Sequence, residues 1–235
     1  MPEAALEVAA IVAAAGLGTR LGRGSKGLVQ LNGRTTLARA VELFLNLDEV
    51  TRIVVVGPPA RLDSASAEVA ALNPRKPVAV CPGGDSRQQS VRAGLMCLTG
   101  ADYVLVHDAA RPLATAVLCR RVLAAAIESG AAFPGLPPRD AVKRVEGSRL
   151  VESLDRSRIV LAQTPQAFSY QLLLKAHFEA HETGLVGDDD AQLVAAAGHP
   201  VTVIEGEPTN LKLTTAEDLE VLEAVLREQE AAARS

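Results

Sequence analysis

VAAIVAAAGLGTRLGRGSK, residues 8–26, is the stretch that decides the fold. Its first half, residues 8–15, is uncharged and carries the β-branched Ile11 and Val12, a pattern typical of a buried parallel strand. Small residues let a backbone approach a ligand closely, and free N–H groups in such a turn bind anions. Glycines and basic residues alternate in the second half, at Gly16, Gly18, Arg20, Gly22, Arg23 and Lys26. The stretch therefore predicts a strand followed by a loop that suits a polyphosphate.

Two common phosphate-binding motifs do not fit this loop. The pattern G-x-x-x-x-G-K-[ST] fails because Lys26 precedes Gly27 and no Ser or Thr comes next. The dinucleotide pattern G-x-G-x-x-G fails because Leu21 stands in place of its third glycine, and no acidic residue ends the next predicted strand, 53–56. The pattern alone leaves two interpretations, a nucleotide-binding loop of another type or an ordinary strand–loop–helix joint with basic surface residues.

The composition restricts the class of protein. The chain has 235 residues, of which 48% are hydrophobic, and this is enough for one domain with a sizeable core spanning residues 1–235. A formal net charge of −4 argues against a general nucleic-acid binder. Aromatic residues make up only 3% of the chain and Trp is absent, which argues against base-stacking platforms.

The cysteines and the N-terminal residues bear on the compartment. Cys81, Cys97 and Cys119 form no C-x-x-C pair and lie in or beside apolar segments, as structural thiols do in a reducing compartment. No Lys or Arg precedes the first apolar run, so that run is not a secretory signal, and no apolar run reaches membrane-spanning length. We expect a soluble cytoplasmic protein that interacts with neither membranes nor nucleic acid.

Apolar, strand-like runs alternate with helix-like segments along the chain. Repeated β–α–β units predict an α/β fold, a mostly parallel twisted sheet with helices on both faces. The expected strands are 8–15, 53–56, 78–81, 103–107, 201–204 and a short one near Leu211. The expected helices are 36–47, 61–72, 86–98, 115–129, 170–182, 189–197 and one starting at Thr215, where Asp218 follows three residues later.

The pattern changes at residues 134–158. This stretch has three prolines, and charged residues alternate with apolar ones from Val142 to Leu154. Such alternation, with few large core residues, favours a protruding β-hairpin or arm over an element of the core.

Three more segments, residues 83–87, 107–112 and 210–214, are expected beyond the carboxyl ends of the strands, where they should meet the loop. Gly83-Gly84-Asp85-Ser86-Arg87 allows close backbone approach, and Asp85, Arg87 and Ser90 can hydrogen-bond a base or ribose, although Asp85 could equally cap the next helix. Asp108 and Arg111 could face substrate hydroxyls or Mg²⁺, or form a buried pair that fixes a loop, whereas His107 is expected to be structural.

Lys212 is unusual because leucines flank it in a strand-like run, NLKLT at 210–214. A lone lysine is seldom fully buried, so this side chain should point into a cleft toward an anion.

Seven motifs after the loop stand in an informative order. Together with AAAGLGTRLG and the following lysine they resemble the 2-C-methyl-D-erythritol 4-phosphate cytidylyltransferases, a family of the nucleotidyltransferases that couple a sugar or polyol phosphate to a nucleoside triphosphate. The resemblance covers about residues 8–228, and the ordered set is far more specific than any one motif. The motifs are GGDSRQQSV at 83–91, VHDAARP at 106–112, DAVKRV at 140–145, LDR at 154–156, QTPQAF at 163–168, DDA at 189–191 and NLKLT at 210–214.

The resemblance implies a Rossmann-like nucleotidyltransferase fold and a homodimer with exchanged arms. The implied reaction joins CTP to 2-C-methyl-D-erythritol 4-phosphate with release of pyrophosphate, in the non-mevalonate isoprenoid pathway. Mg²⁺, held mainly by the CTP phosphates, and the catalytic pair Arg20 and Lys26 would stabilise the charge that develops on the phosphates.

The other site residues are carried over by position. Arg156 and Lys212 match the pair that holds the substrate phosphate, and Asp108 and Arg111 are placed beside them, with Asp108 also as the metal ligand. The nucleotide-binding set is Ala14, Ala15, Gly16, Gly18, Gly84, Asp85, Arg87, Ser90 and Ala109.

Two positions depart from the family pattern. Ala141 replaces the threonine that follows the arm's aspartate, and Gly27 replaces a residue that bears a side chain. Two alternatives therefore stay open, a cytidylyltransferase for another polyol phosphate such as ribitol 5-phosphate and a non-catalytic nucleotide-binding regulator. Retention of Arg20, Lys26 and Lys212 argues against the regulator.

Overall fold

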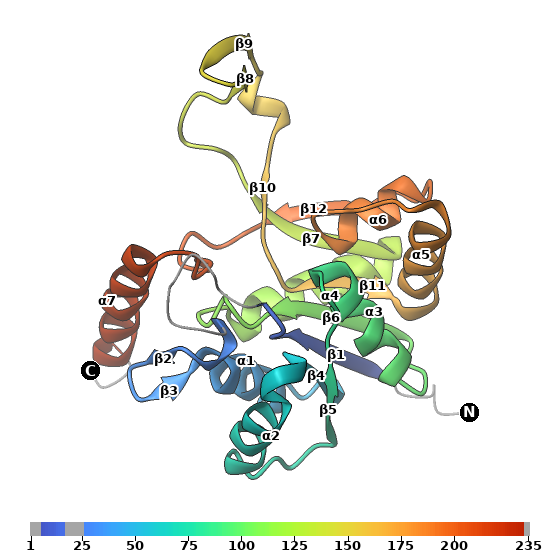
Figure 1. Cartoon of the computed structure of the whole chain (residues 1–235), viewed down its shortest axis with the longest axis vertical. Coiled ribbons are helices and arrows are strands. Elements are labelled where there is room, and N and C mark those ends of the chain that lie inside the picture. The colour runs from blue at the N-terminus through green and yellow to red at the C-terminus, as the bar shows by residue number, and fades with distance from the viewer. Residues whose placement is uncertain (1–5, 17–25, 233–235) are drawn as a thin grey trace.

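A computed structural model of the chain describes residues 6–16 and 26–232, and a twisted sheet runs through its middle (Figure 1). The strand order is β10-β7-β11-β6-β1-β4-β5, and β12 pairs with β7 to make eight strands in the described part of the chain. The bounds are β1 (Val8–Ala13), β4 (Val50–Gly57), β5 (Val78–Pro82), β6 (Tyr103–Asp108), β7 (Ala131–Leu136), β10 (Leu161–Ala162), β11 (Gln166–Ser169) and β12 (Thr202–Glu205).

The strand β1 lies at the centre and pairs in parallel with β4 and β6. The pairs β4–β5 and β7–β12 are also parallel, whereas β11 runs antiparallel to both of its neighbours, β6 and β7. The predicted α/β class with a mostly parallel sheet is confirmed. The strands β7, β10 and β11 of this sheet are not among those expected from the sequence.

Both faces of the sheet are buried, which explains the uncharged run in β1. Val8, Ala10 and Val12 pack on one face, and Ala9 and Ile11 pack on the other. Because successive side chains of a strand point to opposite faces, a strand covered on both sides needs apolar residues at every position.

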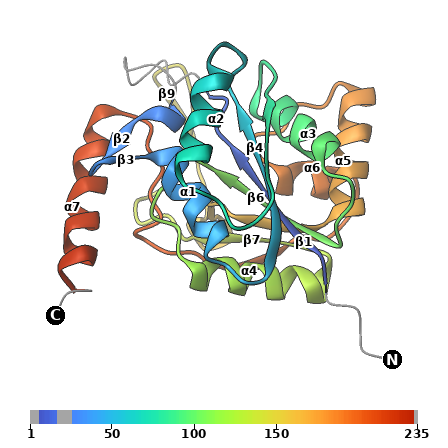
Figure 2. The ribbon, with the colours of Figure 1, turned by 90° about the horizontal axis from the view of Figure 1, so that it is seen from below.

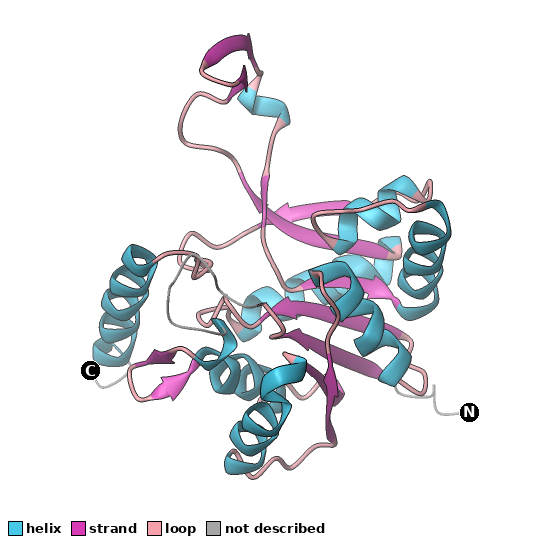
Figure 3. Cartoon of the chain, viewed as in Figure 1, coloured by secondary structure: helices cyan, strands magenta, loops and turns pink. Residues whose placement is uncertain are grey.

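Three helices cover each face (Figure 3). The first face carries α1 (Thr36–Leu45), α2 (Leu62–Ala71) and α4 (Ala116–Ser129). The second carries α3 (Arg87–Cys97), α5 (Tyr170–Thr183) and α6 (Asp190–Ala196). Thr35, Ser86, Thr115 and Asp189 cap four of these helices with a side-chain oxygen, which satisfies N–H groups that a helix start leaves without partners.

A third apolar cluster lies at the end of the molecule away from α3 and α5 (Figure 2). There α7 (Ala216–Ala232) packs near the small hairpin of β2 (Gln30–Leu31) and β3 (Arg34–Thr35). The predicted start of α7 is confirmed, because Asp218 Oδ2 accepts hydrogen bonds from the backbone N–H groups of Thr214 and Thr215. Short 3-10 helices are η2 (Lys26–Leu28), η3 (Pro59–Arg61) and η4 (Arg156–Arg158).

The predicted arm protrudes from the body (Figure 1). It carries the antiparallel hairpin of β8 (Lys143–Glu146) and β9 (Arg149–Ser153), and every residue of these two strands is exposed. The arm begins later than predicted, because residues 134–136 pair with β12 and β10 as the end of β7. We use "arm" below for residues 137–160.

One predicted strand is wrong. Residues 211–214 are irregular in conformation, although Leu211 and Leu213 both pack against the third cluster. The two leucines anchor this segment to the third cluster, and the N–H of Leu213 donates to the carbonyl of Ala110, so the alternation arises there without strand pairing.

The states of the three cysteines and the character of the helices can be compared with what the sequence led us to expect. Cys81 and Cys119 are buried, Cys97 is exposed, and all three are free thiols. Burial raises the pKa of the Cys119 thiol to about 12, so it stays protonated and unreactive. In the described ranges, no helix combines the length and apolar character needed to cross a membrane.

Candidate active site

A cleft of about 610 Å³ opens at the carboxyl edge of β1, β5 and β6. Parallel strands end at the same edge of a sheet, so the loops that follow them meet there, and the volume suits a nucleotide-sized ligand. Its lining comes from the loop after β1 (Ala13, Ala14, Ala15, Gly16), from Gly27 and Pro59, from the loop after β5 into α3 (Gly84, Asp85, Ser86, Arg87, Ser90), from the end of β6 (Asp108, Ala109, Ala110) and from Lys212 and Thr214.

The floor of the cleft is backbone of small residues. The N–H of Ala14 donates to the carbonyl of Val56 at 2.8 Å, and the N–H of Ala109 donates to the carbonyl of Ala13 at 3.0 Å. A Cβ on Gly27 would lie 3.1 Å from the Cβ of Ala14, so the backbone of η2 packs directly on this floor. The close approach leaves room for a ligand above it.

The loop after β5 is held by its own side chains. The N–H of Gly84 donates to Ser90 Oγ at 3.2 Å, and that hydroxyl donates to the carbonyl of Ser86 at 2.8 Å. Ser86 accepts from the N–H of Gln89 and caps α3, so the sequence alternative in which Asp85 caps this helix is wrong. Asp85 is exposed and lines the cleft.

Two glycines in this loop are required by space. A Cβ on Gly83 would lie 2.5 Å from the Cβ of Ala15, and one on Gly84 would lie 2.5 Å from the Cβ of Gln89. Real Cβ atoms do not approach so closely, so both positions need glycine for the loop to pack against the floor.

A buried carboxylate organises the charged side of the cleft. Asp108 ends β6 and accepts hydrogen bonds from Arg87 Nε at 2.8 Å and from Lys212 Nζ at 2.6 Å. Burial alone would raise the pKa of Asp108, but the charges and hydrogen bonds of Arg87 and Lys212 outweigh it and hold this pKa well below its ordinary value. The sequence alternative of a buried Asp–Arg pair is thus present, with Arg87 rather than Arg111 as the partner.

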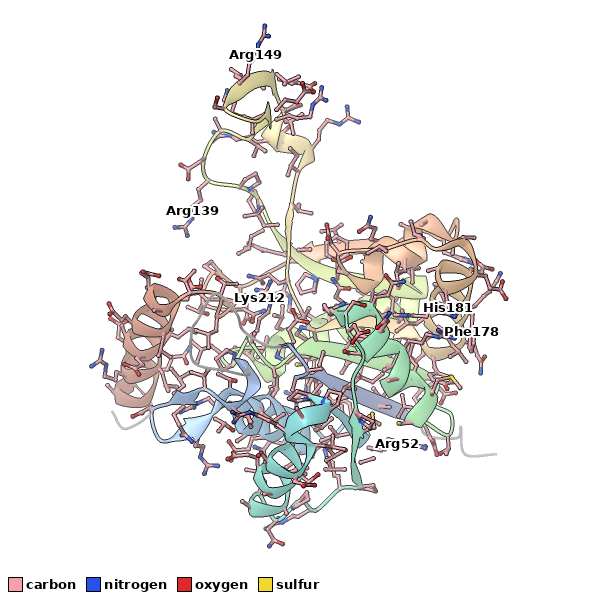
Figure 4. All side chains as sticks on the ribbon, viewed as in Figure 1. Arg52, Arg139, Arg149, Phe178, His181 and Lys212 are labelled. Atoms are coloured by element: carbon pink, nitrogen blue, oxygen red, sulfur yellow. The ribbon has the colours of Figure 1, made fainter. Side chains whose placement is uncertain are left out.

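Arg111 ties two chain segments together beside this cluster. Its Nη1 donates to the carbonyl of Asn210 at 2.7 Å, and its Nη2 donates to the carbonyl of Ala162 at 3.1 Å. It borders a second cavity of about 200 Å³ that shares Arg87, Asp108 and Lys212 with the cleft. Lys212 lines the cleft, as its sequence context predicts. It lies near the base of the arm, and Arg139 and Arg149 lie farther out along the arm (Figure 4).

His107 is structural, as expected. It is fully buried, with Nε2 3.1 Å from the carbonyl oxygen of Arg111 and Nδ1 3.0 Å from Thr164 Oγ1. Burial lowers its pKa to about 4, so the ring is neutral at pH 7.

The comparisons with known proteins agree with this geometry. The family model described as IspD, 2-C-methyl-D-erythritol 4-phosphate cytidylyltransferase, matches residues 8–228. The chain belongs to the 2-C-methyl-D-erythritol 4-phosphate cytidylyltransferase family. A member from Geobacillus kaustophilus is 40% identical over 92% of this chain and 96% of its own length. A bifunctional IspD/IspF enzyme from Anaeromyxobacter dehalogenans is 44% identical over 93% of this chain and 57% of its own length.

A solved structure extends the family likeness to three dimensions. The 2-C-methyl-D-erythritol 4-phosphate cytidylyltransferase of Thermus thermophilus superposes with a TM-score of 0.77 at 35% identity, over 94% of this chain and all of that one. The fold and the order of the sequence motifs thus agree in assigning the family.

Most residues predicted for the site meet at one place in this family member. The cleft brings together Ala14, Ala15, Gly16, Gly84, Asp85, Arg87, Ser90, Asp108, Ala109 and Lys212, and Arg111 borders the adjoining cavity. Gly18, Arg20 and the side chain of Lys26 lie outside the described residues. Arg156 is exposed on the arm, where its Nη1 donates to the carbonyl of Arg139, and it does not line the cleft of its own chain.

Two buried residues behind the cleft were not predicted. Asp190 lies 2.8 Å from Arg87 and 2.9 Å from His177. The DDA motif contains Asp190, but a pattern of two acids at a helix start favours a helix cap, and Asp189 is the residue that caps α6. The pairing with Arg87 joins distant segments and leaves no local signal.

Proposed function

We propose that the cleft binds CTP and 2-C-methyl-D-erythritol 4-phosphate and transfers the cytidylyl group from the first to the second. A phosphate oxygen of the polyol phosphate attacks the α-phosphorus of CTP in line. A new P–O bond forms there, the bond from the α-phosphorus to the bridging oxygen breaks, and pyrophosphate leaves with that oxygen. The single observation that carries the proposal is a nucleotide-sized cleft at the strand ends with a buried, charged cluster on one side, in a chain of this family.

The two sides of the cleft would hold different parts of the reactants. The small residues Ala14 and Gly84 leave room at the cleft for the base and ribose, the Asp85 side chain faces them, and a pyrimidine needs less room than a purine. Lys212 and Arg111 supply positive charge on the opposite side for the phosphate of the polyol. Arg20 and Lys26 are the residues we assign to charge stabilisation on the transferring group.

The described part of the chain offers few ligands for a divalent cation. Among the residues described, no group of three or more His, Cys, Asp or Glu side chains could hold a metal ion. Mg²⁺ usually keeps few protein ligands and is bound by one or two carboxylates together with substrate phosphates, and Asp108 at the cleft fits that mode. When bound there, Mg²⁺ would neutralise charge on the CTP phosphates.

We further propose a homodimer in which the arms are exchanged. The arm and the residue after it expose five large apolar residues, Val145, Leu150, Val151, Val160 and Leu161. Apolar surface on a segment without a core of its own favours burial against another chain. Arg156, which does not reach its own cleft, would then serve the cleft of the second copy.

Pyrophosphate release from CTP tests the proposed reaction. With 2-C-methyl-D-erythritol 4-phosphate as acceptor we expect turnover, with much less for ribitol 5-phosphate and none without an acceptor. ATP and GTP in place of CTP should be poor donors. Preference for ribitol 5-phosphate would assign the other polyol phosphate, and CTP binding without turnover on any acceptor would favour the regulator.

A further inference from the structure

Arg87 lies between two buried carboxylates. Its Nε donates to Asp108 Oδ1 at 2.8 Å, and its Nη1 lies 2.8 Å from Asp190 Oδ2. The second contact is an ion pair without an aligned hydrogen bond, since Asp190 Oδ2 accepts none from the described residues. The third nitrogen, Nη2, is buried and has no hydrogen-bond partner in the described part of the chain. Arg87 is thus hydrogen-bonded to Asp108 and attracted to Asp190 by charge.

Asp190 itself is outside the cleft. It is the first residue of α6, has 0% exposure and lines neither of the two cavities. His177 on α5, also buried, donates to its Oδ1 at 2.9 Å. Burial would raise the pKa of Asp190, but Arg87 and His177 outweigh it and keep this carboxyl ionised. Asp190 therefore places a fixed negative charge behind Arg87.

We propose that Asp190 is a positioning residue for the transfer reaction. Its charge attracts Arg87 and so prevents Arg87 from binding both oxygens of Asp108. Asp108 Oδ2 is thereby left to Lys212 and the cleft. The inference rests on the proposed function for its effect on catalysis, but the geometry it describes is independent of the reaction. His177 supports the role by fixing the orientation of the Asp190 carboxylate.

The geometry of the guanidinium gives the reason. The atoms Nε and Nη2 lie on one side of the group and together form the side-on fork that binds both oxygens of a carboxylate. In this structure only Nε of that fork is bonded to Asp108, while Nη1 is directed to Asp190. Without the charge at Asp190, a small rotation would bring Nη2 onto Asp108 Oδ2. That oxygen is the one Lys212 now binds at 2.6 Å.

Loss of the charge at Asp190 should therefore disturb one side of the cleft only. Arg87 would engage both oxygens of Asp108, so that its Nη2 would compete with Lys212 for Oδ2 and weaken the hydrogen bond that positions Lys212. The base-binding side, at Gly84 and Ser90, is held by its own hydrogen bonds and should be unaffected.

Asp190→Asn is the direct test, since it keeps the shape of the side chain and removes its charge. We expect kcat to fall about 10- to 100-fold, the range typical of a misplacement of about 1 Å in a site. Binding of CMP, measured by calorimetry, should change less than about threefold, because CMP reports on the base side, which the hydrogen bonds of Ser90 to Gly84 and Ser86 hold without Arg87. Wild-type kcat and KM for both substrates in this variant would overturn the proposal.

Tyr170→Phe is the matched control. The Tyr170 hydroxyl donates to the carbonyls of Leu95 and Leu98 in the same helical layer, and it does not contact Arg87. The control should lower the unfolding temperature as a lost buried hydrogen bond does, while kcat stays within about twofold of wild type. A loss of kcat as large as that of Asp190→Asn would mean that general loosening of the layer explains both.

A double-mutant cycle tests whether Asp190 acts through Arg87. In an Arg87→Gln background, adding Asp190→Asn should change kcat less than about twofold, because the group it positions is gone. Independent effects that multiply would reject the proposal. The double variant removes the charges of Arg87 and Asp190 together and leaves Asp108 with Lys212, so it remains informative if Asp190→Asn alone does not fold.

A crystal structure of Asp190→Asn separates this inference from the proposed function. We expect Arg87 to hold both oxygens of Asp108 and the hydrogen bond of Lys212 to Asp108 to be lengthened or lost. An unchanged Arg87 would overturn the inference even if the enzyme is a cytidylyltransferase. A wild-type protein that releases no pyrophosphate from CTP would instead overturn the proposed function and leave the Arg87 geometry to be decided by the structure.

Discussion

The cleft and the arm both carry ion pairs, but the two regions are built in opposite ways. At the cleft, Asp108 has 8% side-chain exposure and is shared by Arg87 and Lys212. On the arm, Arg144 and Glu152 also lie 2.9 Å apart, yet their side chains are 58% and 49% exposed. Water competes for exposed charges and screens them, whereas buried charges must be paired within the protein.

This difference in burial distinguishes charged side chains that one chain holds in place from those that would need a second copy of the chain to hold them. Both carboxylates around Arg87 are buried between β6, α3, α5 and α6, so their geometry is fixed in one chain. The strands β8 and β9 have no buried residue, and Arg156 is bonded within the exposed arm, to the carbonyl of Arg139, away from the cleft of its own chain.

The largest effect is expected from a mixture of two inactive variants. Lys26→Ala and Arg156→Ala should each lower kcat by about 10²–10³, as loss of one strong electrostatic contact does. If Arg156 serves the second copy, a mixed dimer has one site with both defects and one with neither. Random mixing should then restore about a quarter of wild-type activity.

Mass spectrometry must confirm that mixed dimers have formed in that experiment. No recovery of activity in confirmed mixed dimers would place Arg156 at the cleft of its own chain, and the contrast between cleft and arm would fail.

The second prediction changes an acid to its amide in each region. Asp108→Asn leaves Lys212 without its carboxylate and Arg87 with only Asp190, so we expect a loss of about 3 kcal/mol in the free energy of unfolding. Glu152→Gln on the arm should change it by less than about 0.5 kcal/mol. Urea unfolding of the two variants measures both values, and equal losses would contradict the contrast.

The third prediction concerns pH and arises only in the body, because the arm contains no histidine. His107 has a pKa of about 4 when folded, so the unfolded chain takes up a proton first as the pH falls. Stability from this group is fully present above about pH 6.5 and should drop by about 2 kcal/mol between pH 7 and 5. In His107→Gln, which can still bond Thr164, urea unfolding at both pH values should show that drop largely removed.

The smallest effect compares two glycines. Gly27 lacks space, since a Cβ would lie 3.1 Å from the Cβ of Ala14, whereas Gly147 in the arm has open space but a φ of +59°. Gly27→Ala should push on the cleft floor and raise KM for CTP about two- to fivefold. Gly147→Ala should strain only the hairpin turn, at about 1 kcal/mol, and leave KM for CTP unchanged. A higher KM in the Gly147 variant alone would reverse this assignment.

Local patterns in the sequence were enough for much of the fold. The uncharged run in β1 has apolar residues for both faces of the sheet, and the glycines after β5 are needed where a Cβ would collide. The alternation of charged and apolar residues from Val142 to Leu154 also predicted a protruding hairpin or arm at 134–158, and residues 143–153 form an exposed hairpin. These features depend on neighbours along the chain, so a single sequence carries them.

Tertiary structure decided how the charges pair. Nothing local distinguishes Arg87 as the partner of Asp108 from Arg111, which is only three residues away from that acid and instead binds two carbonyls. Nothing local reveals that Asp190 stands behind Arg87, or that Lys212 reaches the cleft from a segment that is not a strand. A buried charge takes whichever opposite charge the packing of distant segments brings within reach, and that choice is made only when the helices and the sheet come together.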